Sequence, residues 1–141
     1  MLAALALLLA LSDPEVRPAV VVVDGIEVQD SFTLHVFTRL NSIETTLGTN
    51  GETLAAIRSS FTTVQRDEID RTAEAGKDAL AVARTLLNGY IETFRAPAIT
   101  HERAKAREAK LKDQRATIEK QIRVLALVLT QQVTQKRGEQ P

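Results

Sequence analysis

By residue type, two histidines are the side chains in this sequence that are best suited to metal binding or acid–base catalysis. His35 and His101 are its only histidines, and imidazole is both a common metal ligand and a common general base. They fall in different predicted helices, and no second histidine or carboxylate four residues on completes a ligand pair. We therefore expect both to be surface or packing residues, with no metal site and no cofactor.

The acidic side chains and the motif content point away from catalysis. Asp67, Glu68 and Asp70 are expected on adjacent faces of a helix, which is typical of a solvated surface. The sequence contains no Cys, no glycine-rich phosphate loop, no nucleophile elbow and no HExxH pair. These are the patterns that carry nucleophilic, phosphoryl-transfer and zinc chemistry. The sequence therefore predicts a protein that is not an enzyme.

The stretch from 103 to 115 has the charge to contact an anion. Its six basic side chains would neutralise phosphates of a nucleic acid or an anionic surface: Arg103, Lys105, Arg107, Lys110, Lys112 and Arg115. The alternative is a solvated helix face, laced with Glu102, Glu108 and Asp113 and facing acids of 67–78 across a helical hairpin. No aromatic residue is interleaved for base stacking, and the net charge is zero. These observations favour the alternative and disfavour nucleic acid as a partner.

A row of residues spaced alternately four and three apart dominates the chain, and we call it the first seam. A 3.5-residue repeat keeps one helix stripe aimed at a partner helix over many turns. All its positions but one are apolar. The row is Val36, Leu40, Ile43, Leu47, Asn50, Leu54, Ile57, Phe61 and Val64.

The segment 48–51 leaves two interpretations of this first helix open. Gly48 can close one helix, and Thr49 with Glu52 fits a capping box that opens the next. Against a break, the repeat passes through these residues without slipping. Asn50 would then form a polar layer in the seam, a device that sets register and oligomer number.

A second seam follows, one residue out of phase, so a discontinuity is expected between Val64 and Ile69. The first helix should begin near Asp30 or Ser31, either of which can cap it. The helix from about 53 should end before Pro97, and Thr100 can cap the last helix. The run 124–129 is apolar on all sides and is expected to be buried against more than one neighbour. The second seam comprises Ile69, Ala73, Gly76, Leu80, Ala83, Leu87, Tyr90 and Phe94. The last helix should pack through Leu111, Ile118, Ile122, Leu125, Leu129 and Val133, either folding back as an antiparallel hairpin or running onward.

The first thirty residues are unusually apolar. MLAALALLLAL is too short to cross a membrane, and we expect a retained helix buried against a partner, with a membrane-contacting segment or a secretory signal as alternatives. Four valines precede Asp24-Gly25, a strong signal for a β-hairpin; an extended arm is the alternative. We expect docking through Leu5, Leu8, Leu9, Val21 and Val23.

Composition agrees with long helices rather than a compact core. Only 4% of the 141 residues are aromatic, and there is no Trp. Residues 1–60 carry three basic and seven acidic side chains, and residues 98–141 carry ten and five. We therefore predict a mainly α fold: an elongated coiled coil or helical hairpin with a short N-terminal β-hairpin or β-arm. The expected parts are a docking segment (1–30), a stem (31–96) and a basic, then apolar, C-terminal helix (97–141).

The first seam also predicts self-association. Leu40 and Leu54 at position a, with Ile43 and Ile57 at position d, shift preference away from two strands. We therefore expect a homotrimer ahead of a dimer. The apolar N-terminus should bind other structural proteins.

The anchor VVVVDGIEV and the stem LNSIETTLGTNGETLAAIRSSF together resemble the small coiled-coil fibre, needle and connector proteins of tailed phages. The resemblance implies an N-terminus that docks into a particle and a stem that trimerises. The basic C-terminal third departs from a fibre, which favours a connector or internal part. The expected function is structural, in a virion or another large assembly, or otherwise in the cytoplasm. The alternatives are a membrane-surface protein and a nucleic-acid-associated scaffolding or packaging protein.

Overall fold

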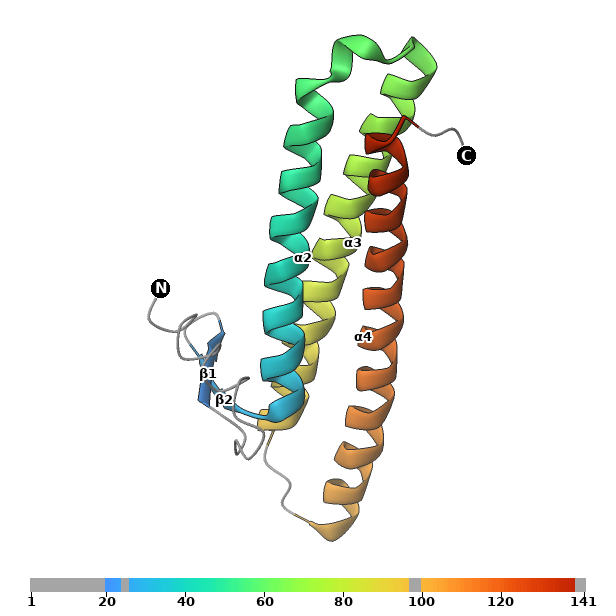
Figure 1. The fold of residues 1–141 in the computed structure, drawn as a ribbon. Helices are drawn as coiled ribbons and strands as arrows, with labels where there is room; N and C mark the ends of the chain where they lie inside the picture. Colours follow the sequence, from blue (N-terminus) through green and yellow to red (C-terminus); the bar gives the residue numbers. More distant parts are fainter. Residues whose placement is uncertain (1–19, 24–25, 97–99, 139–141) are drawn as a thin grey trace.

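Three long helices and a short β-ribbon make up the part of the chain that the computed structural model describes, residues 20–23, 26–96 and 100–138 (Figure 1). The mainly α fold class is confirmed. In chain order the elements are β1 (Val20–Val23), β2 (Ile26–Gln29), α2 (Ser31–Ala56), the 3-10 helix η1 (Arg58–Ser60), α3 (Thr63–Arg95) and α4 (His101–Lys136).

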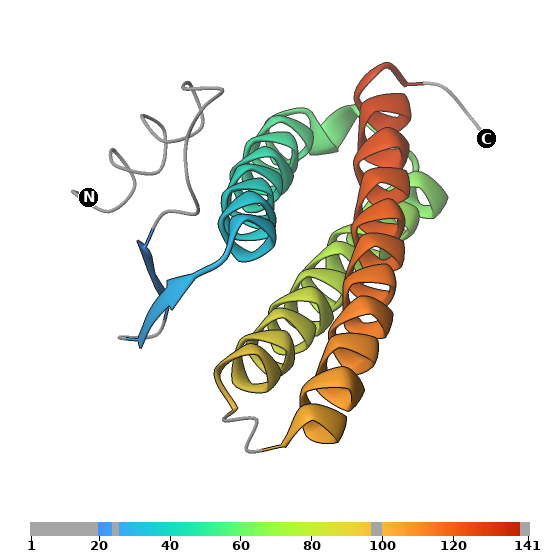
Figure 2. The same cartoon turned by 90° about the horizontal axis from the view of Figure 1, so that it is seen from below.

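The helices run up, down and up, so that α3 is antiparallel to both α2 and α4 (Figures 1 and 2). The most extensive packing is between α3 and α4, which fold as the antiparallel hairpin that was one of the two expectations. Their 33 and 36 residues span about 50 and 54 Å at 1.5 Å per residue. The elongated shape therefore follows from helix length.

Side-chain caps set where each helix begins. The Asp30 carboxylate accepts the Thr33 amide at 3.1 Å and the Thr33 hydroxyl at 2.9 Å. Thr62 and Gln65 form a reciprocal capping box at the start of α3. Thr100 caps α4 as expected, accepting the Arg103 amide at 3.1 Å. The bonds from the amides of Thr33, Gln65 and Arg103 each satisfy a helix N–H that has no partner within the helix.

The break in the long helical segment is not where the sequence placed it. The prediction that a helix starts near 53, with a capping box at Thr49 and Glu52, is wrong, because α2 continues to Ala56 and α3 starts at Thr63. The chain turns at 57–62, just before Val64 rather than after it. Gly48 and Gly51 are therefore interior helix residues, and the continuous-helix interpretation is correct.

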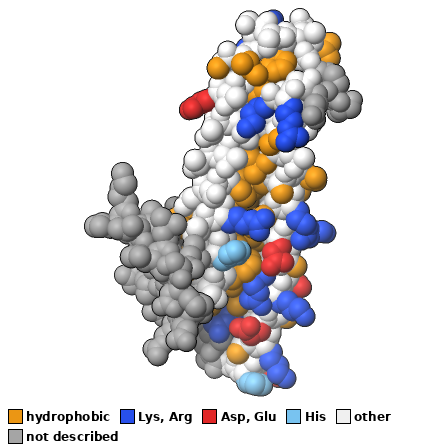
Figure 3. Space-filling view, viewed as in Figure 1, with side chains coloured by type: hydrophobic (Ala, Val, Ile, Leu, Met, Phe, Trp, Pro, Cys, Tyr) orange, Lys and Arg blue, Asp and Glu red, His pale blue; other side chains and the backbone are white. Residues whose placement is uncertain are grey.

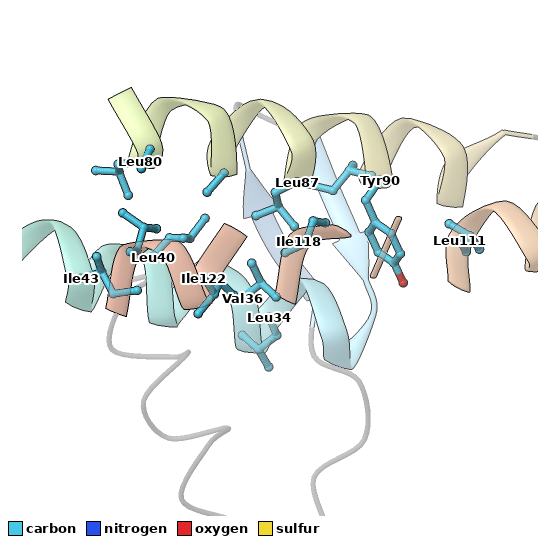
Figure 4. Close-up of a cluster of buried hydrophobic side chains, with 14 residues drawn as sticks. Leu34, Val36, Leu40, Ile43, Leu80, Leu87, Tyr90, Leu111, Ile118 and Ile122 are labelled. Carbon is cyan, nitrogen blue, oxygen red and sulfur yellow. The ribbon is translucent and has the colours of Figure 1, made fainter. Parts of the chain in front are cut away.

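The core lies along the axis of the bundle and draws on all three helices (Figure 4). Each fully buried aliphatic side chain contributes about 1.5–3 kcal/mol of transfer free energy. Leu40, Ala83, Ile118 and Leu125 are completely inaccessible to solvent. Near one end of the core, the ring of Tyr90 packs against that of Phe32 in a tilted arrangement, with a centroid distance of 5.0 Å.

At the N-terminal side, β1 and β2 pair antiparallel, with Val20 opposite Gln29 and Val23 opposite Ile26. Asp24 and Gly25, where the sequence predicts the turn, lie outside the described residues. The hairpin as a whole therefore stays a prediction.

Candidate functional site

The first seam is buried inside a single chain. Val36, Leu40, Ile43 and Leu54 are at most 7% exposed, and Leu47 is half-buried and packs against the core. The side chains that cover the seam come from α3 and α4 of the same chain. In this fold the stripe has a partner already, so it offers no open face to another copy.

The seam ends earlier than the repeat suggested. Ile57 is 37% and Val64 is 74% exposed, so neither belongs to the stripe that is buried within the bundle. The chain leaves the helical path at Ile57, and the 3.5-residue spacing has no meaning through the turn. Phe61 is buried in a smaller cluster with Leu54 and Ile69, which ties the turn to both helices.

Asn50 forms a polar layer within the bundle. It is 4% exposed, and its Nδ2 donates to Gln132 Oε1 at 3.1 Å. Its Oδ1 accepts from Lys136 Nζ at 2.7 Å. Both partners are on α4, so the layer fixes the register of α2 against α4. The sequence identified Asn50, but its partners are more than eighty positions away and carry no local signal.

The second seam is largely buried, with corrections at its edges. Ile69, Gly76, Leu80, Ala83, Leu87 and Tyr90 are buried, and Phe94 is half-buried against the core. Ala73 is exposed, whereas Thr72 beside it is buried and accepts from Gln135 Nε2 at 2.8 Å.

The apolar run on α4 is not surrounded on all sides. The helix does pack against two neighbours, α2 and α3, but Val124 is 44% and Leu127 is 70% exposed. Only one stripe of α4, which includes Leu125 and Val128, faces the bundle. With three helices in the bundle, the opposite face of α4 is left to solvent.

The basic residues of 103–115 lie on the lower half of α4, among acidic side chains (Figure 3). Arg103, Lys105, Lys110 and Lys112 are exposed. The expectation that they face the acids of 67–78 is wrong. Those acids lie beside the other end of α4, where Gln131 Nε2 donates to Glu68 Oε1 at 3.2 Å.

Two of the arginines in this stretch are held by α3 and its cap. Arg107 Nη1 donates to the carbonyl of Ala96 at 2.8 Å, and Arg115 Nη1 donates to the Tyr90 hydroxyl at 3.4 Å. Burial raises the pKa of Tyr90, and the Arg115 hydrogen bond opposes that rise in part. Tyr90 therefore stays a neutral core residue at physiological pH.

Two of the three acidic residues expected on a solvated surface, Glu68 and Asp70, form surface ion pairs. Asp70 receives two hydrogen bonds from Arg58, at 2.8 and 3.0 Å, and these hold the pKa of its carboxyl below the usual value. Glu68 pairs with Arg71 at 2.7 Å. Arg58 and Asp70 join the turn to α3, which is a structural role.

The histidines are exposed on separate helices, His35 on α2 and His101 on α4. Among the described residues, no group of three or more His, Cys, Asp or Glu side chains is arranged to hold a metal ion. None of the helices in this part combines the length and apolar content needed to cross a membrane.

The expected docking residues Leu5, Leu8 and Leu9 lie outside the described residues. The backbone of Val21 and Val23 lies in β1, and nothing in the described core tests their docking role. Comparison with protein-family models, with curated proteins and with solved structures gives no match. The function proposed below therefore depends on the residues and contacts of this chain.

Proposed function

We propose that this chain is a non-enzymatic structural protein that joins a larger assembly through residues 1–30. The bundle serves as a rigid spacer, and the N-terminal segment serves as the docking element. The larger assembly would be a particle such as a phage virion, in which the chain is a tail, neck or fibre part, as the sequence resemblance implies.

The observation that supports this proposal is the burial of both seams within one chain. Because α2, α3 and α4 cover one another's apolar stripes, the bundle needs no partner for its core. Outside the three helices, apolar sequence is concentrated in the run of residues 1–11 and in the valines at 20–23. Apolar sequence at this density is typical of a surface that binds another protein.

The homotrimer expected from the first seam becomes an alternative mode of assembly. Three copies could share this seam only if α2 left α3 and α4, because those helices already cover it. The assembly proposed here instead places the contacts between proteins outside the bundle.

Deletion of residues 1–29, which keeps the Asp30 cap of α2, tests the proposal. The remaining chain should stay helical by far-UV circular dichroism and sediment as a smaller species than the full chain. Cross-linking followed by mass spectrometry on the full chain should place intermolecular links mainly in 1–30. If the truncated chain keeps the mass of the full-length assembly, the docking element is elsewhere.

The two alternatives from the sequence have their own tests. Flotation of the full chain with liposomes would favour the membrane-surface function. A steep loss of DNA affinity with rising salt would favour the scaffolding or packaging function, because it reports neutralised phosphates.

A further inference from the structure

A groove of about 550 Å³ lies between the C-terminal end of α3 and the N-terminal half of α4. This volume lies within the range of small-molecule sites. The groove belongs neither to the buried seams nor to the N-terminal segment, so a spacer function does not account for it. Its polar and charged lining is Glu92, Thr93, Arg103, Arg107, Lys110 and Gln114.

The net positive charge of this groove favours an anionic ligand. Three cations, Arg103, Arg107 and Lys110, stand against one carboxylate, Glu92, which leaves a net charge of +2. None of the three cations forms an ion pair within the described residues. A phosphate monoester carries about −1.5 to −2 at pH 7 and balances this charge.

Arg107 is held at the groove by its bond to the Ala96 carbonyl, which uses Nη1. Its Nε is buried and has no hydrogen-bond partner among the described residues. The Nε and Nη2 edge of a guanidinium is a fork that matches two oxygens of a phosphate. A small rotation of the side chain toward a phosphate would give Nε–H the acceptor that it lacks.

Gln114 places a second requirement on the ligand, which is a hydrogen-bond donor. Its Oε1 is also buried and has no partner in the described part of the chain, and a carbonyl oxygen accepts hydrogen bonds only. A ligand hydroxyl near the phosphate would donate to it. The two unpartnered atoms, one donor and one acceptor, therefore call for an anion that also carries a hydroxyl group.

We propose that the groove between α3 and α4 binds the phosphate monoester of a small hydroxylated molecule, with Arg107 and Lys110 on the phosphate and Gln114 on the hydroxyl. A polyanion fits less well, because Lys105 and Lys112 do not line the groove and Glu92 does. The same phosphate chemistry can come from a free metabolite or from a lipid headgroup.

Titration of the full chain followed by amide NMR tests the proposal, with inorganic phosphate and glycerol 3-phosphate as probes. We expect saturable shifts around the groove and tighter binding of glycerol 3-phosphate. Arg107→Gln and Lys110→Gln should each weaken binding about fivefold or more, since each removes a charged hydrogen bond. Lys112→Gln removes the same charge from α4 outside the groove and should change affinity less than about twofold.

Further variants and probes test the hydroxyl contact of Gln114 and the source of the phosphate group. Gln114→Met should abolish the advantage of glycerol 3-phosphate over inorganic phosphate. If Arg107→Gln perturbs the fold, Arg103→Gln replaces it. Preferred binding to vesicles that contain phosphatidic acid identifies the lipid source of the same group. The proposal is overturned by equal losses for Lys112→Gln and Lys110→Gln, by tighter binding of a DNA oligonucleotide than of either probe, or by no saturable shift.

Discussion

Asn50 is a polar residue in an apolar stripe, and its hydrogen bonds explain how the bundle tolerates it. Asn50→Ala would leave Gln132 Oε1 without the donor that it has at 3.1 Å. A buried acceptor without a partner costs about 1–3 kcal/mol. We expect the free energy of unfolding to fall by about that amount, measured by urea denaturation.

A double variant distinguishes the cost of an unpaired buried acceptor from the cost of lost packing contacts at Asn50. Asn50→Leu together with Gln132→Leu removes both partners of the 3.1 Å hydrogen bond at once, and such apolar replacements are often close to neutral. The bond from Lys136 to Asn50 is lost in both variants, so it does not affect the comparison. The double variant should therefore be more stable than Asn50→Ala. Equal destabilisation by the two would show that the hydrogen bond is not what matters at this position.

The ion pair between Arg58 and Asp70 makes a prediction about pH. Hydrogen bonds from Arg58 lower the folded-state pKa of Asp70, so the pair contributes stability above the unfolded pKa. That contribution is lost as the pH falls through the lowered folded value. Arg58→Gln should raise the pKa of Asp70 toward its ordinary value, as measured by NMR titration of the carboxyl. The pair is exposed, so its effect on stability should be small. A titration of Asp70 that is the same in the variant would mean that the pair does not persist in solution.

At the scale of the element, the glycines of α2 and α3 report how closely the helices pack. A methyl group at Gly48 would meet no atom within 4 Å, whereas one at Gly76 would lie 3.1 Å from both Leu47 Cδ2 and Val128 Cγ1. The intrinsic gain from Gly to Ala in a helix is about 1 kcal/mol at either position. We expect Gly48→Ala to raise the thermal midpoint and Gly76→Ala to raise it less or lower it. Because the intrinsic gain is shared, the difference isolates the packing of α3 against α2 and α4. Equal shifts in the two variants would contradict the close approach at Gly76.

At the scale of the whole molecule, two substitutions in α2 and at its end distinguish the bundle from a seam shared by copies. Leu54 is 3% exposed and Ile57 is 37% exposed. In the bundle, Leu54→Asp buries a charge and should cost about 3 kcal/mol or more, whereas Ile57→Asp should cost less than about 1 kcal/mol. A trimer held through the seam would dissociate with either change. Circular dichroism gives the stability, and light scattering gives the mass. Dissociation caused by Ile57→Asp would support the trimer.

The sequence by itself determined the features that depend on local chemistry. Asp30 and Thr100 are caps because their side chains reach an amide three residues on, and α3 ends before Pro97 because a residue ahead of proline leaves the helical region. The apolar stripes were also readable, since a helix with such a stripe must have it covered. None of these features depends on which helix provides the cover.

Only the tertiary structure decided what covers each stripe. The turns at 57–62 and after Arg95 reverse the chain. As a result, α3 and α4 cover the first seam, and no second copy of the chain is needed to bury it. The partners of Asn50, the exposure of Leu127 and the groove beside Arg107 all follow from that reversal. These features join residues far apart in the chain, and a repeat along one helix holds no information about the residues on the helix that faces it.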